Sequence, residues 1–147
     1  MNKVLIIFAH PHLEKSNVNK TMLKEIQTCD GLTINMLYEN YPNFIIDVER
    51  EKKLLLEHNF IVFHHPIHWY SCPGIMKEWI DRVLEIGFAY GPNGERLQGK
   101  NFMQAISTGA PNEAYGPNGY NSFYFKDFLK PFQQTANLCK MIYRKIS

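Results

Sequence analysis

Cysteine is scarce in this sequence of 147 residues, with only Cys29, Cys72 and Cys139 present. Because the three are odd in number and far apart, they fit neither a disulfide framework nor the paired spacing of a zinc knuckle. The chain must therefore build its core from apolar packing, and a domain of this size buries about two-thirds of the surface that its unfolded form exposes. Unpaired thiols are typical of a reducing compartment, so we expect a cytoplasmic protein.

Long apolar runs and an excess of one charge are also absent. No run approaches the roughly 18 apolar residues of a membrane span, and the N-terminus enters an apolar segment without a basic, cleavable leader. Lysine and arginine are scattered, and the formal net charge is only +2. These features predict no binding to nucleic acid and no attraction to an anionic membrane surface. Chemistry on a small molecule remains as the expectation.

Linkers, internal repeats and low-complexity segments are missing as well, so a single domain over residues 1–147 is predicted. Short apolar runs instead alternate with longer segments of helical period, which is the pattern of βαβ units. We predict an α/β fold, with a doubly wound parallel sheet between two layers of helices. The expected strands cover residues 4–9, 32–38, 60–63 and 102–106, with a fifth starting at 141–143. The expected helices cover residues 18–28, a segment capped by Asp47 that includes 54–56, then 73–84, and 123–138 with a break near Pro131.

In doubly wound sheets, ligands bind beyond the carboxyl ends of the strands, where the strand order reverses. The turn after the first strand places Ser16, Asn17 and Asn19 at the start of a helix. Free backbone N–H groups and the helix dipole attract an anion there, and the hydroxyl and amide side chains add neutral donors. A phosphate site is one interpretation, and simple N-capping by Ser16 or Asn17 is the other.

The turn after the third strand contains two large aromatic residues, Trp69 and Tyr70, between Pro66 and Pro73. A planar ligand such as a flavin needs an apolar wall and rigid backbone amides at its edge, which this turn can supply. The histidines nearby could instead hold a metal, but no carboxylate or cysteine spacing completes a tetrahedral set. Among them, His64 is predicted to be packed and hydrogen-bonded, because strand alternation points it away from its neighbour.

The turn after the fourth strand reads Ser107-Thr108-Gly109-Ala110 and is followed by Tyr115. Glycine lets the backbone approach a ligand edge, and the two hydroxyls are candidate donors to the pyrimidine side of an isoalloxazine ring. Tyr115 could close over the site as a donor or a lid. An ordinary turn is the alternative interpretation.

Taken in this order, the turns resemble those of the NAD(P)H:quinone oxidoreductases of the flavodoxin-like fold. The resemblance extends over nearly the whole chain. It is greatest to short bacterial members, such as the ancillary oxidoreductases of glutathione-gated potassium-efflux systems and the general-stress flavoproteins. Its most specific signal is the helix sequence from Pro73 to Val83, followed by Gly87-Phe88-Ala89-Tyr90. Ala110 stands where the family usually has a second glycine.

The resemblance implies a flavin site made of all three turns, with FMN as cofactor, FAD as its alternative and NAD(P)H as co-substrate. By this resemblance, the flavin phosphate is held by His10, Ser16, Asn17, Val18 and Asn19. The isoalloxazine ring is enclosed by Pro66, Ile67, His68, Trp69, Tyr70, Ser107, Thr108, Gly109, Ala110 and Tyr115.

The function implied is two-electron hydride transfer from NAD(P)H through the flavin to a quinone, by a ping-pong mechanism in a homodimer whose site lies at the subunit seam. Some relatives carry a histidine near the position of Asn121, so the predicted catalytic residues for proton supply are Tyr115 and His68, with solvent as the alternative. The other functional hypothesis is a flavin-binding regulatory subunit of a glutathione-gated potassium-efflux transporter.

Other proteins of similar topology fit less well. A one-electron flavodoxin carrier has a glycine- and threonine-rich phosphate turn, which the first turn lacks. A receiver domain would need an aspartate at the end of the third strand, where His64 and His65 stand. The sequence also has no Gly-rich dinucleotide fingerprint and no P-loop.

Relatives continue beyond the segment from Cys139 to Ser147 through a fifth strand and a final helix. The sheet is therefore expected to be shortened at its C-terminus and to expose apolar surface. Such exposure predicts lower stability unless a partner subunit covers the surface.

Overall fold

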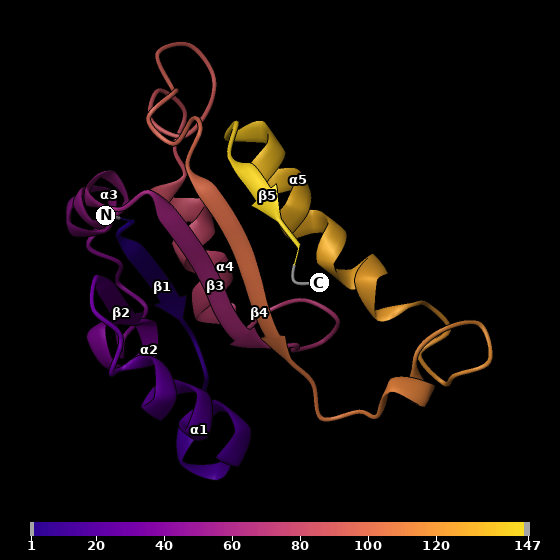
Figure 1. Cartoon of the computed structure of the whole chain (residues 1–147). Coiled ribbons are helices and arrows are strands. Elements are labelled where there is room, and N and C mark those ends of the chain that lie inside the picture. The colour runs from indigo at the N-terminus through magenta and orange to yellow at the C-terminus, as the bar shows by residue number, and fades with distance from the viewer. Residues whose placement is uncertain (1, 146–147) are drawn as a thin grey trace.

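The computed structural model describes residues 2–145. Five parallel strands form one sheet in the order β2-β1-β3-β4-β5 (Figure 1). This order reverses beside β1 as in flavodoxin-like doubly wound sheets, so the predicted fold class is confirmed. The strands are β1 Val4–Phe8, β2 Leu32–Met36, β3 Phe60–Pro66, β4 Asn101–Ser107 and β5 Ile142–Arg144.

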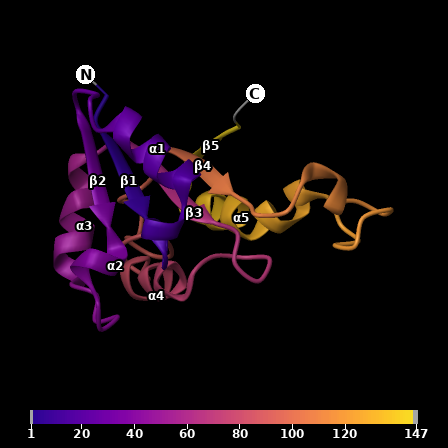
Figure 2. The ribbon, with the colours of Figure 1, turned by 90° about the horizontal axis from the view of Figure 1, so that it is seen from below.

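Helices cover both faces of the sheet and complete the three layers (Figure 2). One face is covered by α1 (Asn17–Ile26). The other face is covered by α3 (Val48–Glu57), α4 (Gly74–Val83) and α5 (Lys130–Leu138), and the short α2 (Leu37–Asn40) packs beside α4.

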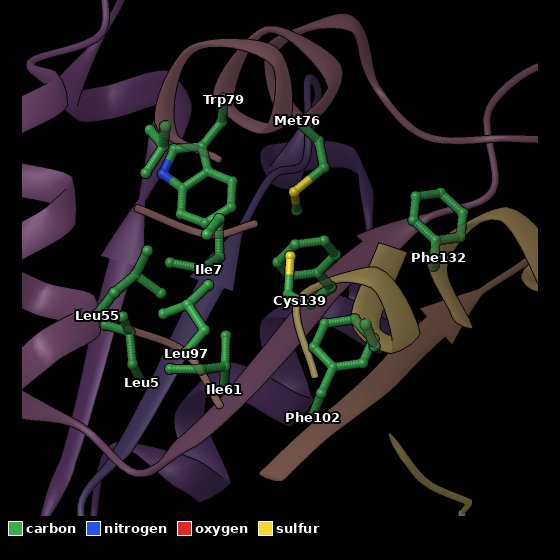
Figure 3. Packing of buried hydrophobic residues seen from close by; sticks show 14 of the residues in the cluster. Leu5, Ile7, Leu55, Ile61, Met76, Trp79, Leu97, Phe102, Phe132 and Cys139 are labelled. Atoms are coloured by element: carbon green, nitrogen blue, oxygen red, sulfur yellow. The ribbon is translucent and has the colours of Figure 1, made fainter. Parts of the chain in front are cut away.

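The central strand β1 contributes to both cores. Leu5 and Ile7 belong to the larger cluster, under α3, α4 and α5, whereas Ile6 and Phe8 belong to the smaller cluster, under α1. Successive side chains of a strand point to opposite faces, so a strand covered on both sides must be apolar throughout. In the larger cluster, Trp79 of α4 lies over the sheet residues (Figure 3).

Two strand boundaries differ from the prediction by more than one residue. β2 ends at Met36 rather than continuing to Tyr38, because Leu37 begins α2 and buries its side chain in the larger core. β3 is longer than predicted, because its pairing with β4 continues as far as Pro66 opposite Ser107. The first residues expected in the following turn, 64–66, therefore belong to the sheet.

The segment predicted as one interrupted helix consists of two parts. Residues Phe125–Leu129 form a 3₁₀-helix, and α5 begins at Lys130. Pro131 lies in the first turn of α5, where its missing N–H leaves no hydrogen bond unmade. The break near this proline is therefore confirmed, and it marks the junction of the two helices.

The face under α1 is less completely covered at β4 and β5. Met103 and Ala105 of β4 are only partly buried, and Ile142 of β5 is 45% exposed. The register places Ile142 opposite Asn101, on the same face as these two side chains. Apolar sheet surface is therefore accessible here, as expected, and its effect on stability stays a prediction.

A fully buried carboxylate connects α3 to its neighbours. The Oε2 atom of Glu51 accepts hydrogen bonds from Trp79 Nε1 of α4 at 2.8 Å and from Asn35 Nδ2 of β2 at 2.5 Å. Its Oε1 atom accepts from the Tyr41 hydroxyl at 2.5 Å and from Arg50 at 2.6 Å. Since a buried charge is tolerated only when it is paired and hydrogen-bonded, these contacts fix α3 against the sheet and α4.

We predict that Glu51→Gln lowers the free energy of unfolding by about 3 kcal/mol, because an NH₂ group would face buried donors in place of an acceptor oxygen. Urea denaturation followed by circular dichroism measures this loss. The control is Glu49→Gln in the same helix, whose side chain is 87% exposed and whose ion pair with Lys52 spans 3.6 Å. The control should change stability by no more than roughly 0.5 kcal/mol. Equal losses in the two variants would contradict the role given to Glu51.

Candidate functional site

The turns after β1, β3 and β4 meet at one edge of the sheet, as Figure 1 shows. The three strands are adjacent and parallel, so their carboxyl ends lie side by side. The register places Phe8 beside His64 and His64 beside Ala105. In doubly wound sheets, this edge is where ligands bind.

The first turn leads into the N-terminus of α1. The Oγ atom of Ser16 accepts a hydrogen bond from the backbone N–H of Asn19 at 3.3 Å, so the predicted capping by Ser16 is confirmed. Within residues 2–145, the N–H groups of Asn17 and Val18 have no acceptor. Unsatisfied first-turn amides and the helix dipole give this end a local positive potential, which suits an anion.

The second turn presents its aromatic residues in a strained conformation. Trp69 and Tyr70 have φ values of 47° and 62°, and His68 and Ser71 pair on either side of them, with the Ser71 N–H donating to the His68 carbonyl at 3.0 Å. Positive φ at both central positions is the pattern of a type I′ turn, which favours glycine or asparagine. Non-glycine residues there cost of order 1 kcal/mol or more each. Since Trp69 is 87% exposed, core packing does not explain this arrangement.

The third turn is held by the hydroxyl of Thr108. The backbone N–H of Ala110 donates to Thr108 Oγ1 at 3.2 Å, and the Tyr115 hydroxyl lies 2.6 Å from the same oxygen. A Cβ atom at Gly109 would meet no other atom within 4 Å, and its φ is not left-handed. Neither packing nor backbone conformation therefore requires glycine here. The space beside Gly109 is open to a closely approaching ligand.

A cavity of about 290 Å³ lies between the second and third turns, close to the lower limit of about 300 Å³ for small-molecule sites. It is lined by Ile67, His68, Trp69, Tyr70, Thr108, Gly109, Ala110, Tyr115, Tyr120 and Asn121. All but the last two are residues predicted to enclose the isoalloxazine ring. The predicted ring contacts Pro66 and Ser107 do not line the cavity, and neither do the residues predicted for the phosphate.

Sequence reasoning missed the contribution of the segment between Gly116 and Phe125, which extends away from the body of the protein (Figure 2). The Tyr70 hydroxyl donates to Asn121 Oδ1 at 3.2 Å, so this segment is attached to the second turn. Tyr120 adds a further aromatic wall. The repeated aromatics of this glycine- and proline-containing segment were a signal, but nothing in their spacing predicted which of them reach the cavity.

A larger cavity of about 600 Å³ lies elsewhere, between β4, β5 and the start of α5. No residue predicted for the site lines it. We assign the candidate site to the smaller cavity, because it is the one at which the turns of the carboxyl edge meet. Volume alone would have selected the larger cavity.

A buried amide connects the first turn to β3 and to the end of β4. The side chain of Asn19, which is only 2% exposed, donates from Nδ2 to Ser16 Oγ at 2.8 Å and to Ser107 Oγ at 3.1 Å. Its Oδ1 atom accepts from His64 Nε2 at 3.1 Å. The packed, hydrogen-bonded role predicted for His64 is therefore confirmed. Contact between Asn19 and a phosphate stays a prediction, since its side-chain amide is already bonded within the protein.

Burial favours the neutral form of three histidines, His10, His64 and His65. It lowers the pKa of His64 to about 4, with a smaller effect from His10, and it lowers the pKa of His65 to about 4. It also lowers the pKa of His10, whose Nδ1 accepts the N–H of His12 at 3.0 Å. An anion at the first turn would thus meet amide and hydroxyl donors and a helix dipole, with the uncharged His64 behind them.

Among residues 2–145, no group of three or more histidine, cysteine, aspartate or glutamate side chains is placed to hold a metal ion. None of the helices in that range combines the length and apolar character needed to cross a membrane.

Comparison with known proteins places this chain in a family. Residues 2–146 match the protein family described as Flavodoxin-like fold. The chain is 45% identical over 139 residues to the glutathione-regulated potassium-efflux system ancillary protein KefG of Enterobacter sp. (strain 638), an alignment that covers 95% of this chain and 76% of KefG. The KefG protein of Yersinia enterocolitica is 46% identical over the same length.

Two solved structures are similar throughout. General stress protein 14 of Treponema denticola, solved in complex with FMN, is 40% identical with a TM-score of 0.93, over 97% of this chain and 82% of that one. The NADPH-quinone reductase of P. pentosaceus is 32% identical with a TM-score of 0.87, over 99% and 83% of the two chains. The chain therefore belongs to the flavodoxin-like family that contains the NAD(P)H quinone reductases.

We predict that the two buried histidines weaken folding in acid. An unfolded histidine has a pKa near 6.5, whereas His64 and His65 stay neutral in the folded protein down to about 4. Between these values the unfolded state binds more protons, so stability present at neutral pH is lost as the pH falls from about 6.5 toward 4. We expect a loss of about 2 kcal/mol per histidine by about pH 5.

Urea denaturation of the flavin-free protein at neutral pH and near pH 5 measures this effect. The variant His65→Leu removes one of the two groups and should retain roughly half of the histidine contribution. Identical pH dependence in the variant and the parent protein would exclude His65 as a source.

Proposed function

We propose that this protein is a flavin-dependent NAD(P)H:quinone oxidoreductase. The observation that carries the proposal is the convergence of the second and third turns on a cavity of about 290 Å³ that is walled by Trp69 and Tyr70. The anion-accepting start of α1 belongs to the same cluster of turns, since Asn19 joins it to Ser107. The FMN complex of general stress protein 14 and the NADPH-quinone reductase of P. pentosaceus support the same conclusion.

The residues present fit a phosphorylated planar ring. Ser16 and the first-turn amides of Asn17 and Val18 would hold the phosphate, with His10 beside them as a neutral group. Trp69 and Tyr70 would cover the ring, and the open space at Gly109 would admit its edge. The further contacts proposed are Asn19, Pro66, Ile67, His68, Ser107, Thr108, Ala110 and Tyr115. FMN is the cofactor proposed, because general stress protein 14, which is 40% identical, was solved in complex with it, and FAD is the alternative.

When bound, the flavin would supply the redox chemistry, accepting hydride from a reduced nicotinamide and delivering two electrons to a quinone. The protein supplies position and shielding. NAD(P)H and the quinone would occupy in turn the same place against the exposed face of the bound flavin, which is a ping-pong order. The aromatic side chains around the cavity exclude water from the reacting groups.

Proton supply is proposed to involve Tyr115. Its hydroxyl is fixed 2.6 Å from Thr108 Oγ1, at the wall of the cavity. A phenol held in place can donate a proton to an acceptor oxygen as negative charge develops there. His68 lines the same cavity and is the second candidate donor.

A homodimer is part of the proposal. Trp69, Tyr120, Phe123 and Tyr124 are each more than half exposed, and they belong to the second turn and to the segment attached to it. Exposed aromatic surface of this kind marks interaction sites. A second copy of the chain seated here would bury these side chains and close the cavity to water.

A second candidate function is favoured by the relatives named KefG, which are ancillary proteins of a potassium-efflux system. In that case the same flavin site would serve a regulatory subunit that binds a transporter. Absence of quinone turnover together with co-purification of a membrane transporter would favour this function over the enzyme.

We expect the purified chain to bind FMN and to oxidise NADH or NADPH when a quinone is supplied. Bound flavin gives visible absorption bands, and extraction identifies it as FMN or FAD. Initial rates at varied concentrations of both substrates should give parallel double-reciprocal lines, as alternating occupancy of one substrate place against the flavin requires. Failure of the folded protein to bind either flavin would overturn the proposal.

We further predict that Tyr115→Phe lowers the turnover number about 100-fold, the size of effect expected when a positioned acid is removed. The control is Tyr120→Phe, which alters a second tyrosine of the same cavity that makes no hydrogen bond through its hydroxyl within the described chain. The control should retain nearly full turnover. If Tyr115→Phe also retains it, while His68→Gln does not, the proton comes from His68.

A further inference from the structure

Both acceptor positions of the Ser16 hydroxyl are occupied from inside the protein. Asn19 donates to Ser16 Oγ through its backbone N–H at 3.3 Å and through Nδ2 at 2.8 Å. A hydroxyl has two lone pairs and one proton, so only the proton remains available. Ser16 is thus presented at the start of α1 as a hydrogen-bond donor.

The orientation of the Asn19 amide determines that Ser16 acts as a hydrogen-bond donor. With Nδ2 toward the serine hydroxyls, Oδ1 faces His64 and can only accept a hydrogen bond. The neutral imidazole of His64 has one N–H, and this contact requires it on Nε2. If the amide turned over, Oδ1 would face Ser16 and draw its proton inward, leaving a lone pair directed at any bound anion.

Within residues 2–145, the one other donor to Asn19 Oδ1 is the Ser107 hydroxyl, which lies farther away than His64 Nε2, at 3.5 Å. Asn19 and His64 are both only 2% exposed, so water does not compete for their hydrogen bonds. The imidazole also packs edge-on against Phe8, with ring centroids 4.9 Å apart, which restricts its rotation. His64 is thus the rigid member of this hydrogen-bonded group, and it orients the Asn19 amide and, through the amide, the Ser16 hydroxyl.

We propose that His64 is a positioning residue for anion binding: its Nε2–H holds the Asn19 amide in the orientation that makes Ser16 a donor toward a phosphate at the start of α1. This inference rests on the proposed function, which places the flavin phosphate there. Under this proposal, a residue that does not touch the ligand controls the preference for a phosphorylated flavin.

FMN and riboflavin are the probes, because they differ only in the phosphate. The quantity measured is the ratio of the riboflavin and FMN dissociation constants, obtained by fluorescence titration of the flavin-free protein. A hydrogen bond to a charged group corresponds to a ratio of about tenfold or more. Ser16→Ala should abolish most of that ratio, and His64→Leu should reduce it to a similar value.

A conservative variant and a double variant distinguish a positioning role of His64 from a packing role. His64→Gln should keep most of the ratio, since a glutamine amide can still donate to Asn19 Oδ1. In a Ser16→Ala background, His64→Leu should change the ratio no further, because the hydroxyl through which it acts is gone.

His58→Leu is the matched control. This buried histidine bonds to Thr33 Oγ1 at 2.9 Å and to the Leu54 carbonyl, at the opposite end of β3 from the site. Its removal should lower stability and leave the ratio unchanged, whereas a merely structural role for His64 would give the same result in both leucine variants.

The outcomes distinguish the two levels of inference. If the parent protein binds neither flavin, the proposed function fails and this inference fails with it. If it binds both equally, the phosphate site is wrong. If it prefers FMN and His64→Leu keeps that preference, or reduces it equally with and without the Ser16 hydroxyl, the proposed function stands and the role of His64 is overturned.

Discussion

The parallel pairing of β1, β3 and β4 is the constraint on which the site depends. The three strands run side by side with their carboxyl ends at one edge, and the register opposes Phe8, His64 and Ala105. A slip of one residue would exchange the two faces of a strand. It would turn His64 away from α1 and toward the larger core, and the link to Asn19 would be lost. The apolar filling of both cores therefore also sets the geometry of the polar turns.

Two buried polar clusters serve this arrangement in different ways. On the face covered by α3 and α4, the charged Glu51 receives four hydrogen bonds and fixes helices that take no part in the cavity. At the carboxyl edge, the cluster around Asn19 is neutral, because burial suppresses the charge of His64. A buried negative charge near the start of α1 would repel an anion, and a fixed positive one would carry its own desolvation cost. Neutral donors aimed by neutral neighbours avoid both penalties.

Local pattern was enough to predict most of the fold. The uniformly apolar β1 identified a central strand, and the apolar positions from Ile75 to Val83 identified α4, since both features repeat with the period of their element. The boundaries of β2 and β3 were missed because tertiary contacts set them, through the burial of Leu37 and the pairing of Pro66. The bond between Asn19 and Ser107 joins residues 88 positions apart, and no local period encodes it. Family resemblance indicated which turns matter but not how they are connected.

The strained second turn shows what these connections achieve. Trp69 and Tyr70 adopt positive φ without the relief of burial that stabilises a strained core residue. Three contacts hold the turn: the pairing of His68 with Ser71, the Ile67 N–H bonded to the Ser107 carbonyl at 2.7 Å, and the Tyr70 hydroxyl bonded to Asn121. Two of the three come from the fourth strand and its following segment, so the position of the aromatic wall depends on the turn opposite it. The cavity is thereby fixed across its width before any ligand enters, which lowers the ordering cost of binding a flat ring.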